Sequence, residues 1–189
     1  MNPTILEGDL VYVNKLAYDF RIPLTLQSLA HLSDPKRSDI SVFFSPEDGT
    51  RLVKRVIGLP GDELELRNNV LFINDEQLNY SALSDEHTKD LMAGLRKQAL
   101  FAEEDLGNHR HAVMSIPSVP TNKRSFEKVV VPSGHYFVMG DNRDLSKDSR
   151  YFGFVPRRQF IGEVTNVIVS FNKLDKYQPR FSRFFTSLN

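Results

Sequence analysis

The residues best suited to chemistry lie in one polar stretch, Gly140–Arg150. Its eleven residues include three acids, three bases, two serines and an asparagine. The apolar run Tyr136–Met139 precedes it, so we expect a strand to lead into a turn rich in complementary charges. Such a turn keeps one shape only if its charges pair internally, and a solvated charged loop is the alternative. Asp144 and Asp148 could suggest a metal site or an aspartic pair, but the bases in the same stretch favour ion pairs.

Lys54 is the second candidate, because it lies in the apolar segment 52–57. A lysine acts as a base only when neutral, so its pKa must fall well below the reference value of about 10.4. Burial among apolar groups has this effect, since desolvation disfavours the charged form. In a strand, Leu52 and Val56 share a face with Lys54, while Arg55 points to the other face. Alternation alone slightly favours an edge-strand lysine whose amine reaches water.

Residues 2–15, 37–43, 54–62 and 140–156 form four segments that resemble, in this order, the signature boxes of the type I signal peptidases. These are membrane-bound Ser/Lys endopeptidases that remove secretory signal peptides. In the second segment, Ser38 stands where the family usually has glycine. The ordered set is more specific than any single box.

The resemblance implies roles for particular residues. Lys54 matches the general base, Ser146 matches a serine that orients this lysine, and Asp148 and Arg150 match a supporting salt bridge. Read without the resemblance, Ser146 is a turn serine that bonds to local backbone. The resemblance also implies shallow apolar pockets for small residues at the first and third positions before the cut, in an extended peptide. Their walls, each of which could equally be plain core, match Met1, Ile5, Val11, Val42, Leu52 and Val53.

The nucleophile of the family is the serine immediately before the methionine matched by Met1. The family's membrane anchor and a second serine of the oxyanion hole lie further upstream. We therefore expect the 189 residues to be a fragment, or a variant without peptidase activity. They contain no apolar run near the roughly 18 residues of a membrane span, so we expect this chain alone to be soluble or peripheral. For the full-length protein, the resemblance implies the bacterial inner membrane, with the catalytic domain on the periplasmic side.

Composition narrows the classes of function. The chain has 24 basic and 24 acidic residues and no cysteine, which argues against a general nucleic-acid binder and excludes thiolate chemistry. For His109 and His111 we expect no acidic or cysteine partner nearby, and therefore no zinc site. No cofactor is expected. By resemblance, the partners are secretory preproteins and, for the full-length protein, a membrane surface.

Short segments rich in Val, Ile, Phe and Tyr, separated by turn residues, predict a mainly β, antiparallel fold. The resemblance implies a core of the signal-peptidase or LexA-like type, formed by residues 1–78 and 128–175. We expect residues 79–127 to be a small inserted α/β subdomain with a helix within 85–105, and residues 14–36 to be a connection. The tail 176–189 is expected to pack on the body rather than on a membrane. The predicted strands are 10–13, 40–44, 52–57, 63–66, 70–73, 128–131, 136–139 and 162–171, with a tight turn at Asn68–Asn69.

Two other functions fit the same residues. One is a non-catalytic, β-rich module that binds peptides in the cleft without cleaving them. The other is a related Ser/Lys peptidase, either a LexA-like self-cleaving repressor or a processing protein of a conjugation system. The insertion and the full last box argue against this second alternative.

Overall fold

The computed structural model describes residues 1–189 except 23–26, 85–87, 92, 108, 174 and 189. Strands dominate it, and their pairing is antiparallel throughout the named sheets, so the predicted mainly β fold is confirmed. None of the helices in the described part of the chain is long and apolar enough to span a membrane.

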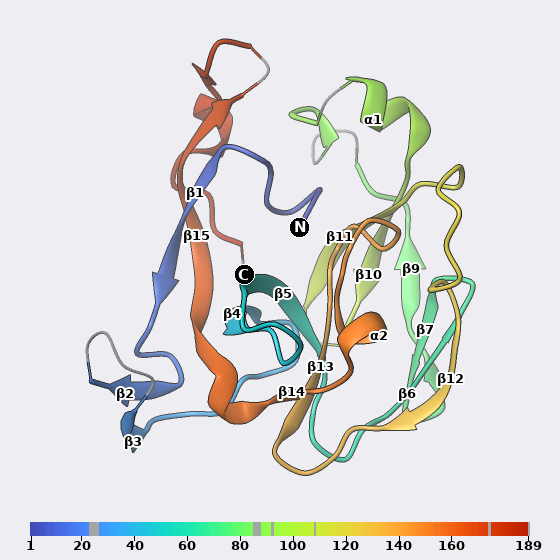
Figure 1. Ribbon diagram of the computed structural model, residues 1–189. Coiled ribbons are helices and arrows are strands. Elements are labelled where there is room, and N and C mark those ends of the chain that lie inside the picture. The colour runs from blue at the N-terminus through green and yellow to red at the C-terminus, as the bar shows by residue number, and fades with distance from the viewer. Residues whose placement is uncertain (23–26, 85–87, 92, 108, 174, 189) are drawn as a thin grey trace.

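The largest sheet has the order β1-β15-β4-β5-β13-β14, and β16 pairs with the outer part of β15 (Figure 1). The predicted strands of this sheet all form, most of them slightly longer than the apolar runs that predicted them. Its strands are β1 (Asp9–Asn14), β4 (Ile40–Phe44), β5 (Arg51–Gly58), β13 (His135–Met139), β14 (Val155–Pro156), β15 (Phe160–Asn172) and β16 (Gln178–Pro179).

A second sheet has the order β12-β6-β7-β8. The turn between β6 and β7 is the predicted Asn68–Asn69 pair, with φ of 49° and 66°. Asparagine tolerates this left-handed conformation, and two such residues in succession give the twist that a tight hairpin requires. The strands are β6 (Glu63–Arg67), β7 (Val70–Ile73), β8 (Glu76–Gln77) and β12 (Phe126–Val130).

The inserted region contains more strand than predicted. Helix α1 (Ala93–Gln98) is short, and a strand follows it directly. The short helix expected within 85–105 is present, although residues 85–87 and 92 lie outside the described part. Residues 100–105 pair with β11, and residues 103–105 also pair with β9, so tertiary pairing outweighs the helix propensity of this stretch. The order of this sheet is β11-β10-β9, formed by β9 (Asn79–Ser81), β10 (Leu100–Asp105) and β11 (Arg110–Ser115).

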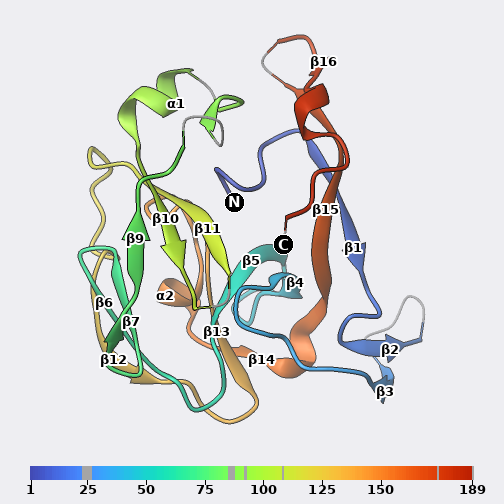
Figure 2. The ribbon, with the colours of Figure 1, turned by 180° about the vertical axis from the view of Figure 1, so that it is seen from behind.

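The segment predicted as a connection, 14–36, carries a small hairpin of β2 (Asp19–Arg21) and β3 (Ser28–His31). In Figure 2 this hairpin lies at the end of β1, away from the inserted strands. Three further single turns complete the fold: α2 (Ser149–Phe152), η2 (Arg157–Gln159) and η3 (Phe181–Arg183). The tail packs on β15, as expected, while Phe181 and Phe185 stay exposed.

Candidate active site

Lys54 and Ser146 meet beside Gly140. Lys54 lies on β5, and the neighbouring strand β13 ends at Met139, just before Gly140. Met139 pairs with Arg55, which places Gly140 near Lys54. A Cβ atom added to Gly140 would lie 2.1 Å from Ser146 Oγ and 3.7 Å from Lys54 Cδ. The two side chains therefore flank the same face of this glycine.

The surroundings of Lys54 favour its neutral form. Burial is the largest influence and lowers the pKa of the amine, and the charge of Arg150 lowers it further. Asp148 and Asp141 act in the opposite direction, and the net shift is downward. Among the described residues, Lys54 forms no ion pair with either carboxylate, and the buried Ser146 Oγ has no hydrogen-bond partner. A largely desolvated amine beside a free hydroxyl is the arrangement that a general base requires.

Asp148 and Arg150 form a buried, two-pronged ion pair. Arg150 Nε donates to Asp148 Oδ1 at 2.8 Å, and Arg150 Nη2 donates to Oδ2 at 2.7 Å. Asp148 is also the N-cap of α2 and accepts from Arg150 N. Its Oδ2 also accepts from Gly140 N at 2.9 Å. Asp148 thus closes the loop 140–148 at both ends, which fixes the position of Ser146.

A second buried ion pair was missed. Arg55, which is fully buried, donates to both carboxylate oxygens of Asp141 at 3.0 Å. Thr4 donates its hydroxyl proton to the same carboxylate. Burial alone would raise the pKa of Asp141, but the charge of Arg55 lowers it to about 2. Strand β5, the loop after β13 and the N-terminal segment are therefore tied together at one carboxylate, a contact that alternation along β5 cannot predict.

The remaining charges of the polar stretch pair outside it. Arg143 donates to the buried Glu104 of β10, and Asp144 accepts from Arg124 at 2.9 and 3.0 Å. The exposed Lys147 pairs with a glutamate of the loop after β4. The expectation of pairing within the stretch is therefore correct for Asp148 and Arg150 and wrong for these three residues. Each of the three reaches a partner that only the tertiary fold brings near.

The amino group of Met1 lies within electrostatic range of Lys54. Burial lowers the pKa of the Met1 amino group, with the charge of Lys54 acting in the same direction, while the charge of Asp141 raises it. The resemblance assigns a nucleophilic serine to the position immediately before Met1.

Five of the six residues matched to the pocket walls lie together, partly buried against a core of Ile40, Val164, Val167 and Leu188. Leu52 does not join them, because it packs with Phe43, Val56 and Phe160 in a separate cluster. Adjacent residues of a strand point to opposite faces, so Leu52 and Val53 pack in different clusters. We call the five that lie together the wall cluster: Met1, Ile5, Val11, Val42 and Val53.

His111 has two acidic neighbours, so the expectation that it has no acidic partner nearby is wrong. Its Nε2 lies 3.4 Å from Glu104 Oε1 and 3.8 Å from Asp141 Oδ1. Burial, and then the charge of Arg55, lowers the pKa of His111 to about 3. The described residues contain no group of three His, Cys, Asp or Glu side chains arranged to hold a metal.

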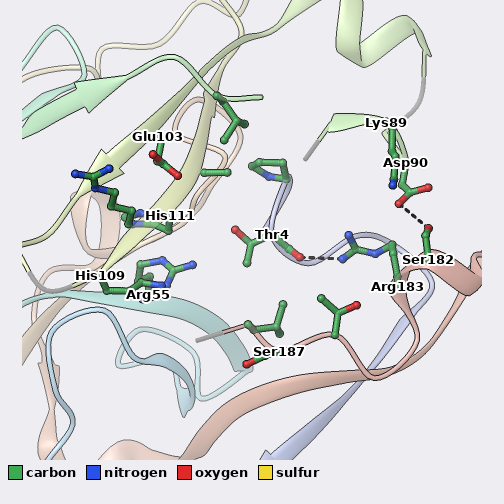
Figure 3. A pocket seen from close by; sticks show the side chains of 16 residues that line it. Thr4, Arg55, Lys89, Asp90, Glu103, His109, His111, Ser182, Arg183 and Ser187 are labelled. Atoms are coloured by element: carbon green, nitrogen blue, oxygen red, sulfur yellow. Dashed lines mark hydrogen bonds between the residues drawn. The ribbon is translucent and has the colours of Figure 1, made fainter. Parts of the chain in front are cut away.

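A cavity of about 360 Å³, called the polar cavity below because most of its lining residues are polar or charged, lies beside this histidine. In Figure 3, Thr4 stands between Arg55 and His111 on one side and Arg183 on the other, with Ser187 at the border. The cavity thus separates the inserted strands from the N-terminal segment and the tail. Its walls come from parts of the chain that are far apart in sequence.

Comparison with known proteins gives one consistent result. The family described as "Signal peptidase, peptidase S26" matches residues 1–169. A signal peptidase I of Pseudomonas fluorescens is 35% identical, over 97% of this chain and 66% of its own length. One from Buchnera aphidicola subsp. Acyrthosiphon pisum is 29% identical, over 95% of this chain and 68% of its own. A crystal structure of a signal peptidase I from Enterococcus faecalis V583 is 32% identical, with a TM-score of 0.44, over 71% of this chain and 99% of that one. The chain spans about two thirds of the length of the curated relatives.

Proposed function

The chain belongs to the signal peptidase family, peptidase S26, and from this premise we propose that it is the catalytic part of a signal peptidase I with a Ser/Lys mechanism. One observation carries the proposal. Lys54 and Ser146 flank Gly140, and the charge of Lys54 acts on the amino group of Met1.

In the proposed reaction, a serine immediately before Met1 attacks the carbonyl carbon of the scissile peptide bond. Neutral Lys54 accepts the hydroxyl proton and then delivers it to the leaving amine. Ser146 orients the lysine amine, and the Asp148–Arg150 pair holds the loop in place. Water then hydrolyses the ester, with Lys54 again as the base.

The proposed substrates are secretory preproteins with small residues at the first and third positions before the cut. The wall cluster supports this proposal, because its side chains are apolar and partly accessible. An extended peptide alternates its side chains, so every second residue would face the same wall. In the full-length protein we place the site at the periplasmic surface of the bacterial inner membrane.

The test is a processing assay on a preprotein with an Ala-x-Ala cleavage site. We expect cleavage by a protein extended upstream with a serine before Met1, and none by residues 1–189 alone. In the extended protein, Lys54→Ala should abolish cleavage, whereas Lys128→Ala, which removes an exposed amine, should leave it unchanged.

Cleavage by the extended Lys54→Ala protein at the unmodified rate would contradict the Ser/Lys mechanism. Peptide binding without any cleavage by the extended protein would instead support the non-catalytic module.

A further inference from the structure

Residues 185–188 run antiparallel to β15 and form one isolated bridge with it, between Ser187 and Asn166. Val167 N donates to Thr186 O at 2.9 Å, and Leu188 N donates to Thr165 O at 2.9 Å. Strand β4 pairs with β15 only over residues 160–163, nearer the start of β15. The segment 185–188 therefore covers part of β15 that β4 does not reach. In both ribbon views the ends of the chain approach each other beside β5 (Figures 1 and 2).

This pairing brings Leu188 beneath the wall cluster. The residue is 9% exposed and belongs to the same apolar cluster as Ile40, Val164 and Val167. The five wall residues that pack against these four are more exposed than the four themselves. Leu188 and its buried neighbours thus form the interior of this apolar cluster, and the wall cluster lies nearer the surface.

Leu188 differs from the other three buried residues of this cluster because it also borders a cavity. It lines the polar cavity shown in Figure 3, together with Ser187, Thr4 and Arg55. A bulky side chain that enters from the wall cluster would therefore have to displace Leu188 toward polar groups. Protein interiors are close-packed, so neighbouring side chains have little room to absorb such a shift.

We propose that Leu188 limits the depth of the apolar pocket that receives a small side chain of the signal peptide, and so contributes to substrate selectivity. This inference rests on the proposed function, because it assumes that peptides bind over the wall cluster. Truncating Leu188 should leave space that a larger substrate side chain can fill, and enlarging it should exclude larger side chains more strongly.

The experiment measures peptide binding, so the protein of residues 1–189 serves as it is. Labelled peptides that end in Ala-x-Ala, and versions with Val or Leu at the last or third-last position, are titrated by fluorescence anisotropy. The unmodified protein should prefer alanine at both positions. Leu188→Ala should weaken this preference at one or both positions by roughly tenfold, the usual effect of a methylene or more in an apolar pocket. Leu188→Phe should strengthen it.

Two variants separate selectivity from general damage. Phe185→Ala changes an exposed residue of the same segment, and Leu188→Met keeps the side-chain volume nearly constant. Both should preserve the preference for alanine. Circular dichroism reports whether each variant is folded. If Leu188→Ala does not fold, the change in alanine preference caused by Leu188→Phe tests the proposal.

The outcomes are distinct. If the unmodified protein binds none of the peptides, the proposed function fails and this inference fails with it. If it binds with a preference for alanine that folded Leu188 variants keep unchanged, only the inference is wrong.

Discussion

At the scale of single residues, the site depends on an amine kept out of water. Lys54 shares its surroundings with two carboxylates and a guanidinium, and desolvation outweighs the carboxylates. In the proposed mechanism this balance lets the amine accept a proton. It also lowers the stability of the folded chain, because the charged form is costly to bury.

Lys54→Met should therefore be more stable than the unmodified protein at neutral pH, and this advantage should shrink as the pH rises to 10. The pKa of Lys54 is lowered in the folded chain, so the unfolded chain binds more protons between the two pKa values. Stability of the unmodified protein then rises with pH through that window. Urea denaturation of both proteins from pH 7 to pH 10 measures the difference, and an advantage that does not change with pH would refute a lowered pKa.

A second prediction concerns the space beside Gly140, which Ser146 occupies. The Cβ atom of Gly140→Ala would lie 2.1 Å from Ser146 Oγ and 2.5 Å from its Cβ, so Ser146 must move away. We expect the serine-extended protein with this change to lose most of its cleavage rate, while Gly94→Ala, with open space around it, keeps the full rate. An unimpaired Gly140→Ala protein would show that the position of Ser146 is unimportant.

At the scale of elements, buried ion pairs hold the loop 140–148 to its neighbours. Asp148 and Arg150 have side chains 0% and 1% exposed, and Asp148 also binds the backbone of Gly140. Removing one partner from such a pair leaves a buried charge without compensation.

Asp148→Ala should accordingly lower the free energy of unfolding by about 3–5 kcal/mol and reduce cleavage by the extended protein. Lys147→Ala breaks an ion pair whose side chains are 57% and 51% exposed, and it should cost about 0–1 kcal/mol. Urea denaturation of the two variants is the measurement. Equal losses would mean that the loop does not depend on the buried pair.

At the scale of the whole molecule, the inserted strands are joined to the core through polar contacts. Glu104 of β10 binds both Arg143 and Tyr80, and His111 of β11 lies against Glu104 and Asp141. Met114 N donates to Asp141 O at 2.9 Å, which adds a backbone contact to the same junction. The groups that face His111 are thus two carboxylates and the guanidinium groups of Arg55 and Arg143.

This junction predicts acid sensitivity. The pKa of His111 is about 3 in the folded chain and near 6.5 when unfolded, so the unfolded chain binds more protons between these values. Stability should fall as the pH drops through this window, and His111 should account for about 2 kcal/mol between pH 6.5 and pH 4.5. Urea denaturation of the unmodified protein and of His111→Phe at both pH values checks this. The variant should show the smaller loss, and an equal loss would exclude His111 as a source.

The sequence by itself determined what depends on local chemistry. Strand periodicity, the Asn68–Asn69 turn and the antiparallel class follow from alternation and turn propensity, and the ordered boxes were enough to indicate the family. The tertiary structure alone decided which charges meet. Asp141 with Arg55 and Glu104 with Arg143 join residues 86 and 39 positions apart, and no local pattern encodes such contacts. The strand at 100–105 and the place of Leu188 beneath the wall cluster have the same origin. In each case, pairing with a distant strand set the environment of the residue, and local propensity did not.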